Sequence, residues 1–399
     1  MATIVSPTTI GQELVTEPQS VRDNLYLTKR RIPELDGLRG LAILLVLICH
    51  YVVNILKVEP GSLLYYARGI LGLTWSGVDL FFVLSGFLIG GILIDVRSSE
   101  TYFKTFYVRR FLRIFPIYYV SLALLAVTIK FASGIPALNW LIGDPLPLAA
   151  YATFTQNIVM SIIGGWGPNW ANVTWSLAIE EQFYIFLPLL IRFTPPHHLI
   201  KVVVLGVVSA PVVRLVLLAL DANIAYSGYA LMPCRADSLG LGVLAAILLR
   251  KPEIVREVVQ RRRIVTACLL LFGLGMVALT ASRSGPATFT LNSIGYTWIA
   301  VFYLLVLVYA LCWPDGWMGA LLRSRPLVYL GTVSYFVYLF HQPVSGFIHY
   351  ILFGAAPAIA GWQGAVASAA ALAITLLCAS ASWKYFERPL VQRGQGYKY

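Results

Sequence analysis

Apolar runs recur along almost the whole chain and are separated by short polar segments. A helix that crosses the hydrocarbon core of a bilayer needs about 20 predominantly apolar residues. The pattern therefore predicts an all-α, polytopic integral membrane protein with about ten transmembrane helices. We expect these helices at 37–56, 70–94, 112–131, 173–191, 200–220, 236–249, 264–281, 291–312, 327–351 and 363–386.

Two apolar segments fit this pattern less well. The sixth span, 236–249, is short and is bounded by Arg250. Residues 148–163 form an additional apolar stretch, which we expect to be a re-entrant or interfacial helix.

The overall composition supports a membrane protein, and the local composition at the two ends of the chain suggests where the membrane domain begins and ends. The 399 residues are 58% hydrophobic and 12% charged, and the mean hydropathy is +0.76. A soluble protein of this length would need a more polar surface. Residues 1–30 lack an apolar signal-peptide core and predict a flexible cytoplasmic tail, before one membrane domain at 31–390 and a short cytoplasmic C-terminus at 391–399. The five cysteines are scattered without CxxC spacing, so we predict neither a disulfide framework nor a metal site.

The net charge of +12 at first suggests that the protein binds nucleic acid, but the distribution of the positive charges along the chain indicates a lipid bilayer as the partner instead. With the N-terminus inside, the predicted inner segments carry 22 of the 30 Lys and Arg residues and the outer segments carry five. Cytoplasmic segments of membrane proteins are enriched in these residues. We therefore predict an N-in/C-in orientation with an even number of spans, lipid as a partner, and no nucleic acid.

The first predicted span contains two ionisable residues. In "LDGLRGLAILLVLICH" (35–50), Arg39 and His50 are 11 positions apart, so they share a helix face about 16 Å apart along the axis. Ionisable groups inside a membrane are costly and are commonly functional. This spacing favours a long substrate that is charged at one end and reactive at the other.

Three further embedded groups are expected at the depth of His50. Asp79, Glu180 and His341 each fall about 20 Å from the inner edge of their spans. We therefore expect a shared polar chamber, with Ser176, Glu180 and Tyr184 as one stripe at four-residue spacing. For His341 a purely structural contact with a neighbouring helix is an equal alternative. Arg214 is interpreted as structural, either snorkelling outward or paired with Asp221.

Basic and aromatic clusters are expected at the two membrane surfaces. Arg109, Arg110 and Arg113 open the third predicted span beside Arg39 and suit a polyphosphate group, although the positive-inside rule alone also explains them. On the outer side, "GGWGPNW" and the Arg235/Asp237 pair in "CRADSLG" are candidates for sugar contact. Interfacial anchoring is the simpler explanation of the tryptophans.

At these residues the sequence resembles acyltransferase family 3, membrane proteins that O-acylate sugars and related hydroxyl compounds. The resemblance runs from Arg31 to Leu390 and rests on Arg39-x10-His50, Arg109-Arg110-x-x-Arg113, "GVDLFFVLSGFLI", "WSLAIEEQFY", "SYFVYLFH" and "YFERPL". It implies an acyl-CoA donor, most simply acetyl-CoA, a sugar-containing acceptor, and a bacterial plasma membrane. Many relatives carry an extracytoplasmic hydrolase-like domain, so we expect that this chain either completes transfer alone or uses a separate transfer protein.

The resemblance also implies the roles of the site residues. We expect Arg39, Arg109, Arg110 and Arg113 to bind CoA phosphates, and His50, oriented by Asp79 or Glu180, to act as general base or transient acyl carrier. The residues expected near the acceptor are His341, Ser176, Tyr184, Arg235 and Asp237. Two alternatives remain: a transporter of a sugar or lipid intermediate with a His/Asp/Glu proton relay, and a scaffold subunit.

Overall fold

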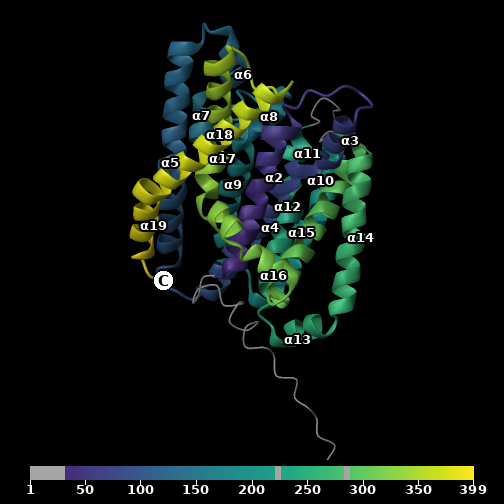
Figure 1. Cartoon of the computed structure of the whole chain (residues 1–399). Coiled ribbons are helices and arrows are strands. Elements are labelled where there is room, and N and C mark those ends of the chain that lie inside the picture. Colours follow the sequence, from purple (N-terminus) through teal and green to yellow (C-terminus); the bar gives the residue numbers. More distant parts are fainter. Residues whose placement is uncertain (1–31, 221–225, 283–287) are drawn as a thin grey trace, which may run out of the picture.

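The computed structural model describes residues 32–220, 226–282 and 288–399. Over these residues it is a bundle of helices with no strand (Figure 1). The predicted tail 1–30 and Asp221 lie outside the described residues. Each predicted span overlaps one of the long helices, which are α2 (Pro33–Ile48), α4 (Gly77–Asp95), α5 (Tyr102–Ala132), α9 (Thr174–Phe193), α10 (Pro196–Leu220), α12 (Ala236–Leu248), α14 (Arg262–Ala281), α15 (Tyr296–Cys312), α17 (Arg325–Phe353) and α18 (Trp362–Ser382).

Short helices lie at both ends of the bundle. In Figure 1, α3 (Leu63–Ile70), α6 (Asn139–Ile142), α8 (Gln156–Ile163) and α11 (Ser227–Ala230) lie toward one end, and α13 (Pro252–Gln260) and α16 (Trp317–Leu322) lie toward the other. The stretch 148–163 is α7 (Leu148–Ala152) followed by α8, two helices too short to span a bilayer. The expectation of a non-spanning segment there is therefore consistent with the structure.

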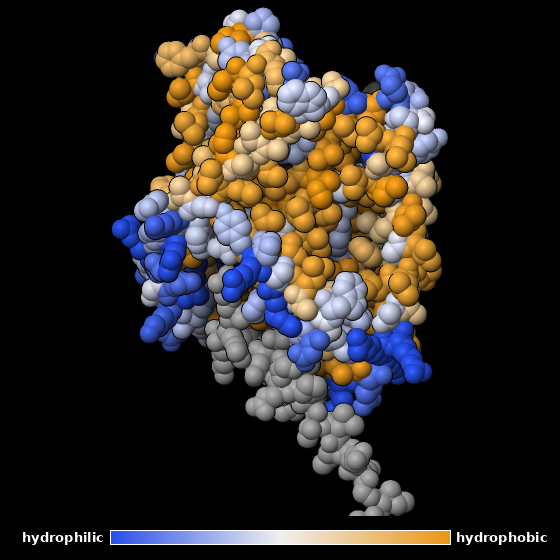
Figure 2. All heavy atoms as spheres, in the orientation of Figure 1, coloured by the Kyte–Doolittle hydropathy of each residue, from blue (hydrophilic) through white to orange (hydrophobic). Residues whose placement is uncertain are grey.

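The helices confirm a polytopic membrane protein. Within the described residues, seven helices are long and apolar enough to cross a membrane, or eight if α12 and α13, bent by 103°, count as one span. This count omits α9 and α17, which are 20 and 29 residues long and carry polar side chains of the candidate site. Figure 2 shows a broad apolar surface with hydrophilic residues concentrated at the lower end. The number of spans and the N-in/C-in orientation stay predictions.

Two helices depart from the expected boundaries. Helix α2 continues past Ile48 as a π-helical turn, η1 (Cys49–Val53), which contains His50. Such turns are rare and occur frequently at functional sites. Helix α5 begins at Tyr102 instead of 112, so Arg109, Arg110 and Arg113 lie within a helix and do not open it. The extra turns are polar, and hydropathy therefore does not reveal them.

Glycines bring the central helices into close contact. A Cβ on Gly40 would lie 1.9 Å from the carbonyl oxygen of Leu327, and one on Gly331 would lie 1.9 Å from that of Asp36. Helices α2 and α17 therefore pack backbone to backbone, and they run parallel, since Gly331 lies against Gly40 and His341 lies against His50. His50 and His341 follow these two glycines by ten residues each, so the same contact brings the histidines together. Helices α4 and α12 also pack closely, at Gly86 and Gly242.

Candidate active site

A cavity between α2, α4, α5, α9 and α17 holds three of the predicted arginines. Arg39, Arg110 and Arg113 line it, and Glu180 is the one carboxylate among its lining residues. Its empty volume is about 840 Å³, which includes open space at the mouth. We call it the arginine cavity.

The arginines of this cavity are poorly balanced by acidic groups. The ion pair of Arg39 is with Asp36, at 3.4 Å. Among the described residues, Arg110 and Arg113 form no ion pair within 4.0 Å. The Nε of Arg110 is buried without a hydrogen-bond partner there, and its guanidinium lies 5.9 Å from the ring centre of Tyr184. Excess positive charge beside a cavity favours an anionic ligand.

The predicted polar stripe of α9 does line the arginine cavity. Ser176, Glu180 and Tyr184 all contribute to its wall. Glu180 accepts hydrogen bonds from Ser85 of α4 at 2.5 Å and from Tyr184 at 3.3 Å. Glu180 therefore belongs to the arginine cavity, and no contact joins it to His50 in the described structure.

A second cavity contains His50. We call it the histidine cavity, and its lining is Val46, Cys49, His50, Asn54, Trp75, Val78, Trp166, Asn172, Val173, Trp175, Tyr229 and Tyr338. His50 is half-buried in its wall. His341, fully buried, lies behind it, with its Nε2 3.2 Å from the Nδ1 of His50.

The carbonyl oxygens around the two imidazoles determine where their protons lie. The Nδ1 of His341 is 2.9 Å from the carbonyl oxygens of both Val337 and Tyr338. Since carbonyl oxygens only accept, this Nδ1 carries the hydrogen and His341 Nε2 is an acceptor. His50 Nδ1, 3.0 Å from the carbonyl oxygen of Val46, is therefore the donor to both neighbours. The neutral His50 then keeps its lone pair on Nε2, the nitrogen that a general base or nucleophile uses.

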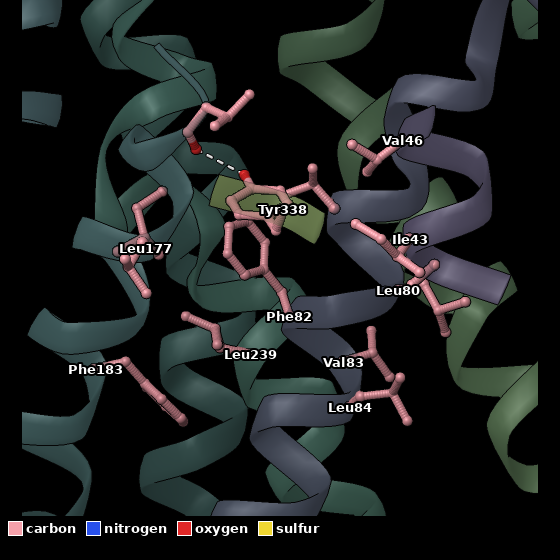
Figure 3. Close-up of a cluster of buried hydrophobic side chains, with 14 of the residues drawn as sticks. Ile43, Val46, Leu80, Phe82, Val83, Leu84, Leu177, Phe183, Leu239 and Tyr338 are labelled. Atoms are coloured by element: carbon pink, nitrogen blue, oxygen red, sulfur yellow. Dashed lines mark hydrogen bonds between the residues drawn. The ribbon is translucent and has the colours of Figure 1, made fainter. Parts of the chain in front are cut away.

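The two cavities share a wall instead of forming one chamber. Val78 and Tyr338 line both. The hydroxyl of Tyr338 donates to the carbonyl oxygen of Val173 at 2.6 Å and is 2.5 Å from Ser176 Oγ. Figure 3 shows the Tyr338 ring between Leu177 and Val46, with its hydrogen bond dashed. The expected single chamber at one depth is therefore wrong, because depth alone does not say which helix faces meet.

Asp79 belongs to neither cavity. It forms an ion pair with Arg235 and accepts a hydrogen bond from Ser238 at 3.3 Å, and no contact joins it to His50 in the described structure. The expectation that Asp79 orients His50 is therefore wrong. The ion pair with a neighbouring helix offsets the free-energy cost of burying a carboxylate inside a membrane-spanning helix.

The expected Arg235/Asp237 pair is also wrong. Arg235 pairs with Asp79, and Asp237 pairs with Arg214 at 2.8 Å. All four side chains are fully buried, so they are not placed to contact a sugar. The carboxylate partner of Arg214 among the described residues is Asp237, whereas the expected partner, Asp221, lies outside them.

Arg109 lies apart from the other two arginines of its motif. Its Nε donates to the carbonyl oxygen of Tyr397 at 3.0 Å, and its guanidinium lies 4.8 Å from the ring centre of Tyr399. Of the three arginines expected to bind phosphates, Arg110 and Arg113 line the cavity, whereas Arg109 does not. Helical spacing permits either Arg109 or Arg110 to share a face with Arg113, so the sequence did not determine which pair faces inward.

Among the residues of the site that the sequence analysis missed, two make defined hydrogen bonds there. Tyr338, in the wall between the cavities, is three positions before His341 and so shares its helix face. Ser85, which holds Glu180, is a polar position inside the apolar run "FFVLSGFLI". The spacing of Tyr338 from His341 and the polar position of Ser85 in an apolar run were each a weak sequence signal for the site.

Comparison with known families agrees with this arrangement. A family model described as an acyltransferase domain matches residues 32–384. The chain belongs to acyltransferase family 3.

Among curated proteins, the chain is 28% identical to the peptidoglycan O-acetyltransferase OatA of Listeria monocytogenes, over 92% of this chain and 57% of the relative. It is 30% identical to the putative peptidoglycan O-acetyltransferase YrhL of Bacillus subtilis, over 79% and 49%, and 24% identical to the O-acetyltransferase OatA of Staphylococcus aureus, over 92% and 58%. The chain thus spans about half to three-fifths of the length of these relatives. No solved structure matches it.

Proposed function

We propose that this protein is a membrane O-acyltransferase that moves an acyl group, most simply acetyl, from acyl-CoA to a hydroxyl of a sugar-containing acceptor. The observation that carries the proposal is the wall of Val78 and Tyr338, which the arginine cavity shares with the cavity of His50. A polyphosphate-bearing thioester and a basic nitrogen would meet where the two cavities adjoin, at Val78 and Tyr338. The relatives named as peptidoglycan O-acetyltransferases support a polysaccharide acceptor at a bacterial plasma membrane.

On the donor side, Arg39, Arg110 and Arg113 would bind the phosphates of CoA by charge-assisted hydrogen bonds. The pantetheine arm would extend along the cavity toward Tyr338. Glu180, held by Ser85 and Tyr184, lies in the same wall and would orient a nearby arginine or the pantetheine amides.

On the acceptor side, His50 Nε2 would remove the hydroxyl proton as the oxygen attacks the thioester carbonyl. The new C–O bond forms, the C–S bond breaks, and the proton passes from His50 to the leaving thiolate. His341 would hold His50 in the required tautomer by accepting from Nδ1, as the third group does in catalytic triads. In the carrier variant, Nε2 attacks the thioester first and hands the acyl group to the hydroxyl, or to a separate transfer protein.

The test is the release of free CoA thiol from acetyl-CoA by protein purified in lipid, with a panel of sugar acceptors. We expect release by the wild type and a loss of at least about 100-fold in His50→Ala, the order of magnitude of general base catalysis. The Tm of both proteins shows that the variant is folded. Full activity in His50→Ala would refute both catalytic roles. No release with any donor would favour the transporter alternative.

A further inference from the structure

The histidine cavity has a lining unlike that of its neighbour. It presents five large aromatic side chains, two amides and one imidazole, and it has no carboxylate, lysine or arginine: Trp75, Trp166, Trp175, Tyr229, Tyr338, Asn54, Asn172 and His50. We propose that this cavity is the binding site of the acceptor saccharide, with Trp166 as a platform for a sugar ring. This assignment rests on the proposed function and specifies where its second substrate binds.

The chemistry of the lining suits a neutral polyol. Flat aromatic faces pack against the C–H faces of a pyranose ring, while amides both donate to and accept from its hydroxyls. Binding sites of this kind are largely apolar with a few oriented polar groups. The arginine cavity, with three cations, suits an anion instead. The difference in charge between the two cavities therefore assigns the anionic donor to the arginine cavity and the neutral saccharide to the histidine cavity.

Trp166 is held as part of a preformed surface. Its ring centre lies 6.3 Å from that of Trp175 and 5.7 Å from that of Tyr229, both of which line the same cavity. Its loop turns at Gly164 and Gly167, which have φ of 66° and 67°, a conformation that glycine adopts most readily. A platform fixed before binding loses little conformational entropy when a ligand arrives.

The amide wall of the cavity is tied to the histidine pair. Gln342, next to His341 in α17, donates to Asn172 Oδ1 at 2.8 Å, and Asn172 donates to Asn169 at 2.9 Å. Asn54 is exposed at the rim, one turn after His50. A hydroxyl bound between these amides would be placed beside the imidazole that deprotonates it.

Membrane anchoring does not account for Trp166. Trp362, whose side chain is 75% exposed, shows what an interfacial tryptophan looks like in this protein. Trp166 instead is half-buried and directs its ring into the aromatic cluster. Trp362→Ala is consequently a matched control for the loss of one tryptophan.

The experiment measures acetyl transfer by the full chain in lipid nanodiscs, with acetyl-CoA and soluble oligosaccharides of N-acetylated hexosamines as probes. In Trp166→Ala we expect the KM for the oligosaccharide to rise by at least about tenfold, while the KM for acetyl-CoA stays within about twofold. Trp166→Phe, which keeps a flat ring, should recover most of the loss, and Trp362→Ala should match the wild type.

Three outcomes would overturn the assignment. The first is an unchanged oligosaccharide KM in Trp166→Ala, and the second is an equal rise in both KM values. The third is CoA release by the wild type without acetylation of any oligosaccharide, which would leave the donor site standing. If the wild type releases no CoA at all, the proposed function itself fails, and this assignment fails with it.

Discussion

The contact of α2 with α17 offers a direct test of whether the histidine pair is functional. A Cβ added at Gly40 would lie 1.9 Å from the carbonyl oxygen of Leu327, whereas real Cβ atoms essentially never come closer than 3.0 Å to such an atom. In Gly40→Ala one helix must therefore retreat by about 1.1 Å, the difference between these two values. Backbone atoms form the opposing surface, so no side-chain rotation relieves the clash.

This retreat is large compared with the tolerance of the histidine contact. His50 Nδ1 and His341 Nε2 are 3.2 Å apart, and a full retreat along their line would separate them by about 4.3 Å, beyond hydrogen-bonding distance. A lost hydrogen bond of this kind is worth about 1 to 1.5 kcal/mol. Since about 1.4 kcal/mol corresponds to a factor of ten in rate, we expect kcat to fall by about tenfold. Both KM values should change less, because neither cavity loses a lining side chain.

The assay compares kcat, both KM values and Tm for the wild type, Gly40→Ala and Gly206→Ala. Gly206 lies in α10 with no atom within 4 Å of an added Cβ, so its variant controls for a glycine-to-alanine change in a membrane helix. A Gly40→Ala protein with wild-type kcat and Tm would refute the reasoning. A lowered Tm with unchanged kcat would refute the link from helix packing to the histidine pair.

Two further predictions concern buried partners. In His341→Leu, kcat should fall by about tenfold or more with little change in the KM for acetyl-CoA, because His50 Nδ1 loses one of its two acceptors and keeps only the carbonyl oxygen of Val46. Steady-state kinetics check this, and an equal rise in KM would contradict a positioning role. Asp79→Leu should destabilise the fold by about 3 to 5 kcal/mol, because it leaves Arg235 buried and unpaired, and Asp79→Leu combined with Arg235→Met should recover most of this. Denaturant unfolding of the three proteins checks the second prediction, and equal stability of single and double variants would contradict it.

The sequence predicts the helices well because the hydrocarbon core requires long apolar runs with internally satisfied backbones. The run 291–312 coincides with the helical segment formed by η6 (Leu291–Gly295) and α15. The start of α5 was predicted ten residues too late, because its first turns are polar and carry no hydropathy signal. Helical structure beyond the apolar run depends on contacts that the sequence does not reveal, such as Arg109 with the backbone of Tyr397.

The site was predicted only in part, because the position of a residue along its helix gives depth but not its neighbours. Depth alone placed Asp79, Glu180 and His341 beside His50. Of these three, the structure brings only His341 to His50, while Asp79 pairs with Arg235 and Glu180 lines the arginine cavity. The decisive information is the rotation and pairing of helices, which the glycines of α2 and α17 determine through backbone contact.

The balance of embedded charge gives a last prediction. Arg214 and Arg235 each have a carboxylate partner, whereas Arg110 and Arg113 have none within 4.0 Å among the described residues. Unpaired cations are costly away from water, so an anion that binds them should stabilise the folded protein. We therefore expect CoA to raise Tm in a concentration-dependent way, with about 2.7 kcal/mol of stabilisation at 100 times its Kd.

The same measurement on a variant tests whether the arginines cause the effect. In Arg113→Gln the CoA concentration needed for a given rise in Tm should increase by about tenfold or more, because a charge-assisted contact is lost. Arg68→Gln is a control, since Arg68 lines a different pocket, beside Tyr65 and Leu279. If CoA raises the Tm of Arg113→Gln as readily as that of the wild type, the arginine cavity is not the donor site. The unpaired charge would then need another explanation.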